Sequence, residues 1–261
     1  MFRTMILNMI KRFVILGGGE SGVGSALLAK QQGYDVFLSD GSSLKNEYRN
    51  ELMNAGIDFE EGKHSSEKIL NADEVMKSPG IPEKTEIMKL IREKGIQVIS
   101  EMELAYRFKG ESKIIAITGS NGKTTTTAMT YHICHEAGLD CAMVGNIGDS
   151  FARRIAEDPS ALYVVEVSSF QLDDIITFRP DIAILTNITE DHLDRYDYKF
   201  ENYIKSKFRI IMNQKATDHF IYCCDDEVTM EYLNKFNIQS NQLSISMKKE
   251  LPNGSFIKDG E

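Results

Sequence analysis

Two glycine-rich loops, each lying between a short apolar run and a helix-like segment, constrain the fold of this chain most. The run RFVIL at 12–16 leads into a loop with glycines at 17, 19 and 22, and the run KIIAIT at 113–118 leads into the loop 119–125. A strand that ends in a glycine turn and continues as a helix is typical of parallel sheets with helices on both faces. The sequence therefore predicts an α/β protein.

The order of the other segments predicts two domains, which a length of 261 residues easily accommodates. Further apolar runs, separated by helix-like segments, lie at 34–40, 96–100, 161–167, 181–188 and 219–224. A helix-like segment at 103–112 ends in a polar turn at Gly110, and a new strand and glycine loop follow at once. We predict a Rossmann-like N-terminal parallel sheet at 1–110, followed by a P-loop NTPase-like α/β central domain at 111–261.

Composition argues against several classes of partner. The formal net charge of −9 disfavours a protein that tracks nucleic-acid phosphates, because such proteins are usually basic. No apolar run approaches the roughly 18 residues of a membrane span. The four cysteines form no C-x-x-C pair, which favours reduced thiols in the cytosol. We therefore expect a cytoplasmic protein with no nucleic-acid or membrane partner. We also expect a monomer, although composition does not determine the oligomeric state.

The first loop has the spacing Gly17-x-Gly19-x-x-Gly22, and Asp40 ends the next strand. Glycines at these positions let a diphosphate approach the backbone, and the following helix offers unpaired amides. The pattern indicates an anionic nucleotide. It leaves three alternatives open: a nicotinamide oxidoreductase, a tight turn without any ligand, and a plain turn role for Asp40 before Gly41.

The second loop predicts binding of ATP phosphates and Mg²⁺. Backbone amides of such a loop surround phosphates, Lys123 neutralises their charge, and the hydroxyl of Thr124 is a magnesium ligand. A strict P-loop has glycine five residues before Gly122, where this chain has Ile117, so the loop is a shortened relative. A bland turn is the alternative.

Polar residues after the two following strands favour a shared site. Glu166 ends the apolar run ALYVVEV, where a carboxylate without a partner is costly, although an edge strand with Glu166 facing solvent is the alternative. His192 lies in the segment NITEDHLDRY after the next strand and, taken alone, reads as a surface histidine. Because parallel strands end at the same edge of a sheet, we expect these residues to lie near Lys123.

Several motifs together resemble the Mur ligase family, most closely its D-glutamate-adding member. They are TGSNGKTT at 118–125, GNIG at 145–148, EVSSFQL at 166–172, SPGI at 78–81 and NITEDHLDRY at 187–196. They cover most of the chain in order and at plausible spacing. The resemblance implies ATP-dependent addition of D-glutamate to UDP-N-acetylmuramoyl-L-alanine through an acyl phosphate, in peptidoglycan precursor synthesis.

The resemblance also implies roles for individual residues. ATP is expected on Gly119, Ser120, Asn121, Gly122, Lys123, Thr124 and Thr125. Catalytic roles fall on Lys123, Glu166, His192 and Lys207, and the implied metal ligands are Thr124, Glu166, His192 and Lys207. The substrate would be bound by Gly17, Gly19, Ser21, Gly22, Asp40, Gly80, Asn146 and His192. In the family the lysine at the position of Lys207 reacts with CO₂ to form a carbamate; from the pattern alone it reads as a solvated helix lysine.

The chain departs from the family in two places near the nucleotides. Gly41 and Ser42 follow Asp40, where the family often has a threonine and a basic residue near uracil. The usual NADD segment after the run HFIY at 219–222 reads CCDD at 223–226, so the family's asparagine is absent.

The C-terminal end predicts a fragment. The tail at 244–261 has the pattern of a β-hairpin with Asn253 and Gly254 at its turn. The family continues into a third, D-glutamate-binding domain, so we expect this chain to be inactive by itself. A nucleotide-binding module without catalysis remains an alternative, as does another Mur-type ligase that adds L-alanine or glutamates on folate.

Overall fold

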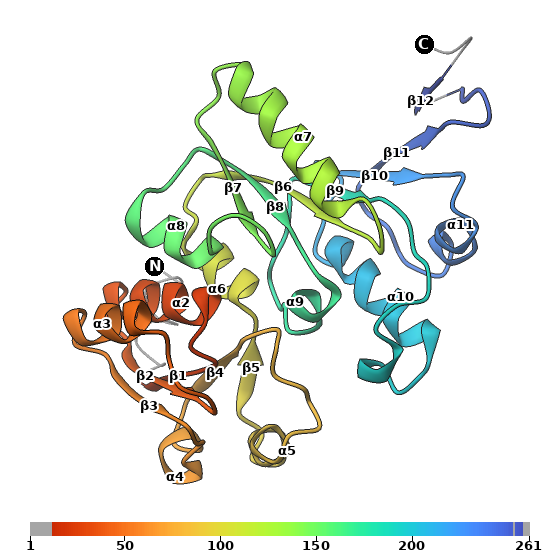
Figure 1. The fold of residues 1–261 in the computed structure, drawn as a ribbon. Helices are drawn as coiled ribbons and strands as arrows, with labels where there is room; N and C mark the ends of the chain where they lie inside the picture. The colour runs from red at the N-terminus through yellow and green to blue at the C-terminus, as the bar shows by residue number, and fades with distance from the viewer. Residues whose placement is uncertain (1–11, 253, 258–261) are drawn as a thin grey trace. The chain divides into compact units, whose positions relative to one another are not determined.

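The computed structural model describes residues 12–252 and 254–257, which form two compact units (Figure 1). The first unit contains the described residues up to Lys109 together with 149–159 and 174–176. The second contains the described residues of 110–148, 160–173 and the chain from Thr177 onward. The segments 149–159 and 174–176, which follow the predicted boundary at residue 110, thus pack with the first unit.

The first unit is built on a five-stranded parallel sheet in the order β3-β2-β1-β4-β5. Its strands are β1 (Arg12–Leu16), β2 (Asp35–Asp40), β3 (Asp58–Glu61), β4 (Glu74–Lys77) and β5 (Gln97–Ile99). Its helices are α2 (Glu20–Gln31), α3 (Asn46–Asn54), α4 (Ser66–Ile69), α5 (Glu86–Glu93), α6 (Glu101–Phe108) and α8 (Phe151–Glu157). The chain builds the sheet outward from β1 and then returns to its other side at β4, so the first glycine loop follows β1 at this switch point.

Burial on both faces explains why β1 is a continuous apolar run. Val14 and Leu16 belong to a core cluster with Ile87 and Met88 of α5. Phe13 and Ile15 are equally buried and, because side chains alternate along a strand, face the other side. Strands covered on both faces read as unbroken apolar segments, as this one does.

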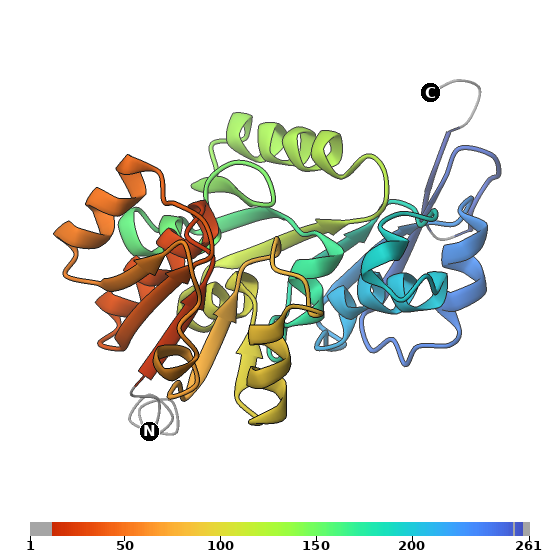
Figure 2. The same cartoon turned by 60° about the horizontal axis from the view of Figure 1, so that its bottom comes forward.

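The second unit is built on a seven-stranded sheet in the order β12-β11-β10-β9-β6-β8-β7, and all of its pairings are parallel. Its strands are β6 (Lys113–Thr118), β7 (Cys141–Gly145), β8 (Leu162–Glu166), β9 (Ile182–Leu185), β10 (His219–Cys223), β11 (Asn241–Ser246) and β12 (Gly254–Phe256). Its helices are α7 (Lys123–Glu136), α9 (Ser169–Asp173), α10 (Phe200–Phe208) and α11 (Glu227–Leu233), with 3₁₀ turns η1 (Leu193–Arg195) and η2 (Arg209–Ile211). Within this unit, Figure 2 shows α7 and α10 on opposite faces of the sheet. The predicted α/β class with two parallel sheets is confirmed.

The predicted hairpin at the end of the chain is wrong. β12 runs parallel to β11, with Ser244 opposite Gly254 and Ser246 opposite Phe256. An antiparallel partner before the turn would have to use Pro252, which lacks a donor, and the charged residues 248–250 have no apolar face to bury. Asn253, half of the Asn-Gly signal, lies outside the described residues.

Among the described helices, none combines the length and apolar character that crossing a membrane requires.

Candidate nucleotide-binding sites

The loop of residues 119–122 lies at the centre of the second sheet. It follows β6, which pairs with β8 on one side and β9 on the other, and it leads directly into α7. The carboxyl ends of all three strands therefore surround the start of α7. This is the place where open parallel sheets bind ligands.

Close contact with the end of β9 determines the shape of the loop. Gly119 has φ 149°, and a Cβ there would lie 1.9 Å from Oγ1 of Thr186. The amide of Ser120 donates to the carbonyl of Asn187 at 2.8 Å, and the amide of Asn121 donates to Oδ1 of Asn187 at 3.0 Å. Sequence reasoning missed Thr186 and Asn187, although polar residues directly after a strand next to β6 are a signal that could have found them.

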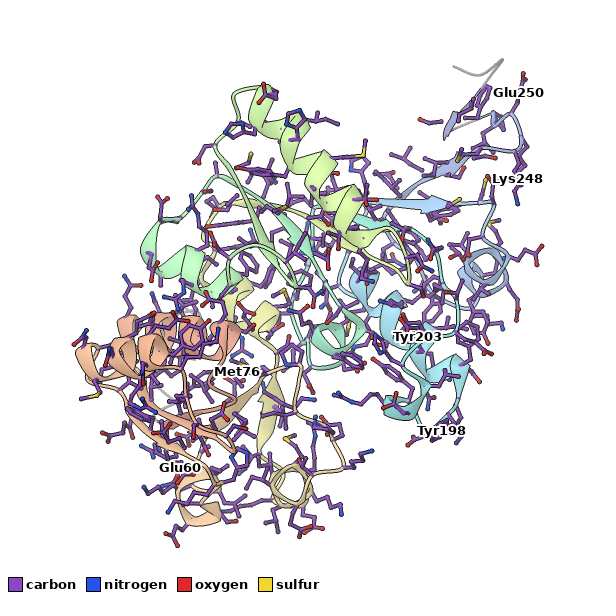
Figure 3. All side chains as sticks on the ribbon, viewed as in Figure 1. Glu60, Met76, Tyr198, Tyr203, Lys248 and Glu250 are labelled. Carbon is purple, nitrogen blue, oxygen red and sulfur yellow. The ribbon has the colours of Figure 1, made fainter. Side chains whose placement is uncertain are left out.

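The other loop residues play distinct parts. Gly122 adopts φ 80° with open space around it, so only its backbone conformation favours glycine. The hydroxyl of Ser120 donates to the carbonyl of Thr189 at 3.0 Å and lies 3.2 Å from the hydroxyl of Tyr203 on α10, which Figure 3 labels. Thr125 is exposed in the first turn of α7.

Lys123 folds back over the loop. Its Nζ donates to the carbonyls of Gly119 and Ser120, each at 2.9 Å. The cation is thereby held at the start of α7, where the helix already favours negative charge. A phosphate group placed here meets both a fixed cation and the backbone amides of the first turn of α7.

Glu166 meets the loop from the neighbouring strand. It is 1% exposed, and β8 lies between β6 and β7, so the alternative of a solvent-facing edge-strand glutamate is wrong. Oε2 accepts a hydrogen bond from Oγ1 of Thr124 at 2.8 Å, and Oε1 accepts one from Nδ2 of Asn146 at 2.7 Å. The structure thus brings together a carboxylate, a hydroxyl and an amide at the end of the glycine loop.

Lys207 is buried, so the solvated position that its pattern indicates is wrong. It is 2% exposed on α10, and its Nζ donates to the carbonyl of Gly119 at 2.8 Å and approaches Oγ1 of Thr118 at 3.3 Å. Burial, followed by the nearby charge of Lys123, lowers the pKa of Lys207 to about 7. Three carboxylates oppose this shift, namely Asp191, Asp173 and Glu166. A substantial fraction of this amine is therefore neutral at physiological pH.

His192 lies apart from this group of contacts. Its side chain is 52% exposed, its backbone adopts φ 50°, and its described contacts are with Asp191 at 3.4 Å and with the ring of Phe170 at 5.1 Å. Its roles in metal and substrate binding stay predictions.

The residues present fit a magnesium ion whose ligands come partly from the protein and partly from a bound nucleotide. Within residues 12–252 and 254–257, no group of three His, Cys, Asp or Glu side chains forms a metal cluster. Thr124 and Glu166 nevertheless place a hydroxyl and a carboxylate oxygen side by side. Mg²⁺ is commonly held by one or two such oxygens together with substrate phosphates and water.

The glycine loop of the first unit has one tightly packed and one open glycine. A Cβ on Gly22 would lie 1.8 Å from the carbonyl oxygen of Gly17, so the helix can approach β1 only with glycine here. Gly19 has φ −79°, and among residues 12–252 and 254–257 a Cβ there would meet no atom within 4 Å. The packing of the protein itself therefore does not explain a glycine at position 19.

The other predicted substrate residues of the first unit also have structural partners. Asp40 accepts hydrogen bonds from the amides of Gly18, at 2.5 Å, and Ser42, at 2.7 Å, as a turn residue does. The hydroxyl of Ser21 interacts with the buried carboxyl of Glu101, whose pKa is raised by burial. Gly80 has open space around it. A contact of any of them with substrate stays a prediction.

Comparison with known families identifies both units. The MurD N-terminal domain matches residues 12–87, and the Mur ligase middle domain matches residues 117–259, more than half of the chain. The chain belongs to the Mur ligase family. The resemblance inferred from the motifs is confirmed.

Sequence relatives of this Mur ligase chain share one name. The UDP-N-acetylmuramoylalanine–D-glutamate ligase of Christiangramia forsetii is 53% identical over 251 residues, covering 96% of this chain and 56% of the relative. The enzyme of the same name from Bacteroides fragilis is 50% identical, covering 97% of this chain and 56% of the relative. The chain spans about half the length of the curated relatives it matches.

Solved structures support the fold. The UDP-N-acetylmuramate:L-alanyl-gamma-D-glutamyl-meso-diaminopimelate ligase from Neisseria meningitides aligns with a TM-score of 0.63 and 19% identity, over 94% of this chain and 82% of that one. The UDP-N-acetylmuramate-alanine ligase of Thermotoga maritima aligns with a TM-score of 0.56 and 22% identity, over 92% and 53%. At these identities the likeness concerns the fold alone.

Proposed function

We propose that this chain is the part of a UDP-N-acetylmuramoylalanine–D-glutamate ligase that binds the UDP-linked substrate and ATP. One observation carries the proposal most: Lys123 and the pair Thr124–Glu166 meet at the carboxyl ends of β6 and β8. A cation beside the amides of a helix N-terminus suits a nucleotide triphosphate, and the adjacent oxygens suit Mg²⁺. Relatives that are 53% and 50% identical in sequence are named for this activity.

The proposed reaction forms an amide in two steps. A carboxylate oxygen of the L-alanine residue attacks the γ-phosphorus of ATP, ADP leaves, and an acyl phosphate forms. The amine nitrogen of D-glutamate then attacks the acyl carbon, loses a proton, and phosphate leaves.

The residues of this chain would serve the first step by position and charge. Lys123 neutralises developing charge on the phosphoryl oxygens, and the loop amides fix their direction. Mg²⁺, when bound by Thr124 and Glu166, supplies further charge neutralisation. Asn146 donates to Oε1 of Glu166 and holds that carboxylate in place, so that Oε2 faces Thr124.

The first unit would bind the UDP diphosphate. The amides at the start of α2 lie beside Gly19, where a Cβ would meet no atom of the described residues within 4 Å. We propose a cytoplasmic, monomeric protein that acts on this nucleotide-linked substrate, with no membrane or nucleic-acid partner.

Substituting Glu166 tests the magnesium part of the proposal. We expect Glu166→Gln to weaken binding of the Mg²⁺ complex of ATP by about tenfold, because an amide oxygen is a poorer ligand than a carboxylate. Binding of ATP in EDTA should not weaken, since the removed charge repels phosphate. Isothermal titration calorimetry with ATP, in Mg²⁺ and in EDTA, measures both.

The exposed Glu201 of α10 provides the matched control. Glu201→Gln should bind ATP like the unchanged chain under both conditions. Unchanged affinity of Glu166→Gln for the Mg²⁺ complex would exclude a magnesium site at Glu166.

We also propose that Lys207 takes up CO₂ as a carbamate, with a new bond from Nζ to the carbon of CO₂ and loss of one proton. Only the neutral amine is a nucleophile. Because the pKa of Lys207 is about 7, the neutral form is minor at about pH 6 and dominant at about pH 8. A carbamate carbon signal in NMR with ¹³C-bicarbonate should therefore grow over this range.

Lys205 lies two positions away on α10 and is exposed, so it serves as the control. The signal should persist in Lys205→Arg and disappear in Lys207→Arg. A signal that survives in Lys207→Arg, or its absence from the unchanged chain at both pH values, would contradict the carbamate.

A further inference from the structure

We propose that His64 is a specificity-determining residue that reads the base of the bound uridine diphosphate, with Nε2 accepting a hydrogen bond from N3–H of uracil. The inference rests on the proposed function of the first unit. It assigns a role to a side chain that no sequence motif singled out.

At the carboxyl end of β2, few side-chain groups remain available to hydrogen-bond a nucleotide base. In an open parallel sheet, a nucleotide whose diphosphate lies at the loop after β1 extends across the end of the neighbouring strand, here β2. Both carboxylate oxygens of Asp40 already accept backbone amides, from Gly18 and Ser42. Gly41 has no side chain.

His64 fills the space that a side chain at position 41 would occupy. A Cβ on Gly41 would lie 3.1 Å from Nε2 of His64, closer than to any other atom of the ring. Nε2 therefore faces the end of β2, while the opposite side of the ring is held inside the unit. His64 is only partly buried. Because Nδ1 is turned toward the buried Ser39, Nε2 is the ring nitrogen left to face a ligand.

A buried serine fixes which nitrogen of His64 carries the proton. Ser39 is fully buried, and its Oγ lies 2.8 Å from Oε1 of Glu60 and 2.7 Å from Nδ1 of His64. The serine has one proton to donate. Glu60, which Figure 3 labels beside β3, decides where that proton goes.

Glu60 is an acceptor. Burial would raise the pKa of Glu60, but hydrogen bonds from the amide and side chain of Ser65 and from Ser39, with the charge of Lys68, together lower it. The ionised carboxylate accepts the hydrogen bond from the hydroxyl of Ser39, so Nδ1 of His64 must donate to the serine oxygen. In the neutral imidazole, Nε2 then carries a lone pair and can only accept.

This arrangement matches uracil and rejects two of its analogues. Uracil presents an N–H donor at N3, whereas cytosine presents a lone pair at N3 that would face the lone pair of Nε2. A methyl group on N3 of uracil removes the donor and adds bulk. A hydrogen-bonding site rejects ligands that leave its polar groups unpaired.

Titration calorimetry with UDP, N3-methyl-UDP and CDP tests the proposal. All titrations use the Lys123→Ala chain, so that the second glycine loop does not contribute. We expect UDP to bind about tenfold more tightly than either analogue. His64→Ala should remove this preference and bind all three alike, while the exposed His132→Ala control keeps it.

The outcomes separate the inference from the function beneath it. Equal binding of the three ligands by the chain with His64 intact overturns the His64 role but leaves UDP binding in place, and this result needs no His64 variant to fold. A preference that persists in His64→Ala overturns it as well. If UDP does not bind at all, the proposed function of the first unit fails and the His64 role fails with it.

Discussion

Replacing Lys123 with alanine is expected to lower the affinity of the chain for ATP by about a hundredfold or more. Truncating a charged partner that is held in a partly buried site typically costs 2–5 kcal/mol, which corresponds to roughly thirty- to several-thousand-fold in affinity. The substitution removes the hydrogen bonds from Lys123 to the carbonyls of Gly119 and Ser120. The loop should keep its shape, because the amides of Ser120 and Asn121 remain bonded to Asn187. The loss of ATP affinity would then come from the missing positive charge and not from unfolding of the loop.

Calorimetric titration of the Mg²⁺ complex of ATP measures this effect directly. Lys205→Ala, at an exposed position of α10, removes the same charge from a side chain that does not contact the loop and should change the affinity less than twofold. Thermal unfolding should show similar midpoints for both variants. If Lys123→Ala binds ATP as the unchanged chain does, the loop of residues 119–125 is not the triphosphate site.

The sequence was sufficient to locate the site at the loop after β6, but not to identify every residue that lines it. Glu166 was predictable because a carboxylate in so apolar a strand is costly without a partner, and the loop after β6 was predictable from Gly122 and Lys123. Lys207 was not, because α10 carries exposed and buried lysines and only tertiary packing decides which one turns inward. The family resemblance, and not the helical pattern, singled it out.

Local signals failed where tertiary structure competed with them. The Asn-Gly pair near the C-terminus favours a hairpin, yet β11 offers its free edge to a parallel strand. The segment 149–159 follows the second glycine loop in sequence, but it packs with the first unit, where Arg153 pairs with Glu20 of α2 and Glu51 of α3. No sequence motif marks His64, because its proposed role depends on contacts with Ser39 of β2 and, through it, Glu60 of β3.

The two glycines of the first loop should respond to alanine in opposite ways. Gly22→Ala is expected to lower the free energy of unfolding by about 3 kcal/mol, because its Cβ would lie 1.8 Å from the carbonyl oxygen of Gly17. That carbonyl cannot move freely, since the amide of Gly17 is bonded to the carbonyl of Ser39 at 2.9 Å. Urea unfolding followed by circular dichroism measures the change.

Gly19→Ala serves as the matched substitution in the same loop. Its backbone, at φ −79° and ψ −170°, suits alanine and its surroundings are open, so stability should change by less than about 0.5 kcal/mol. Affinity for UDP should nevertheless fall about tenfold, because the added methyl group would occupy the space through which a diphosphate approaches the amides of α2. Unchanged UDP binding by Gly19→Ala would mean that the diphosphate does not use this side of the loop. A Gly22→Ala chain as stable as the unchanged one would show that α2 can move away from β1 without loss.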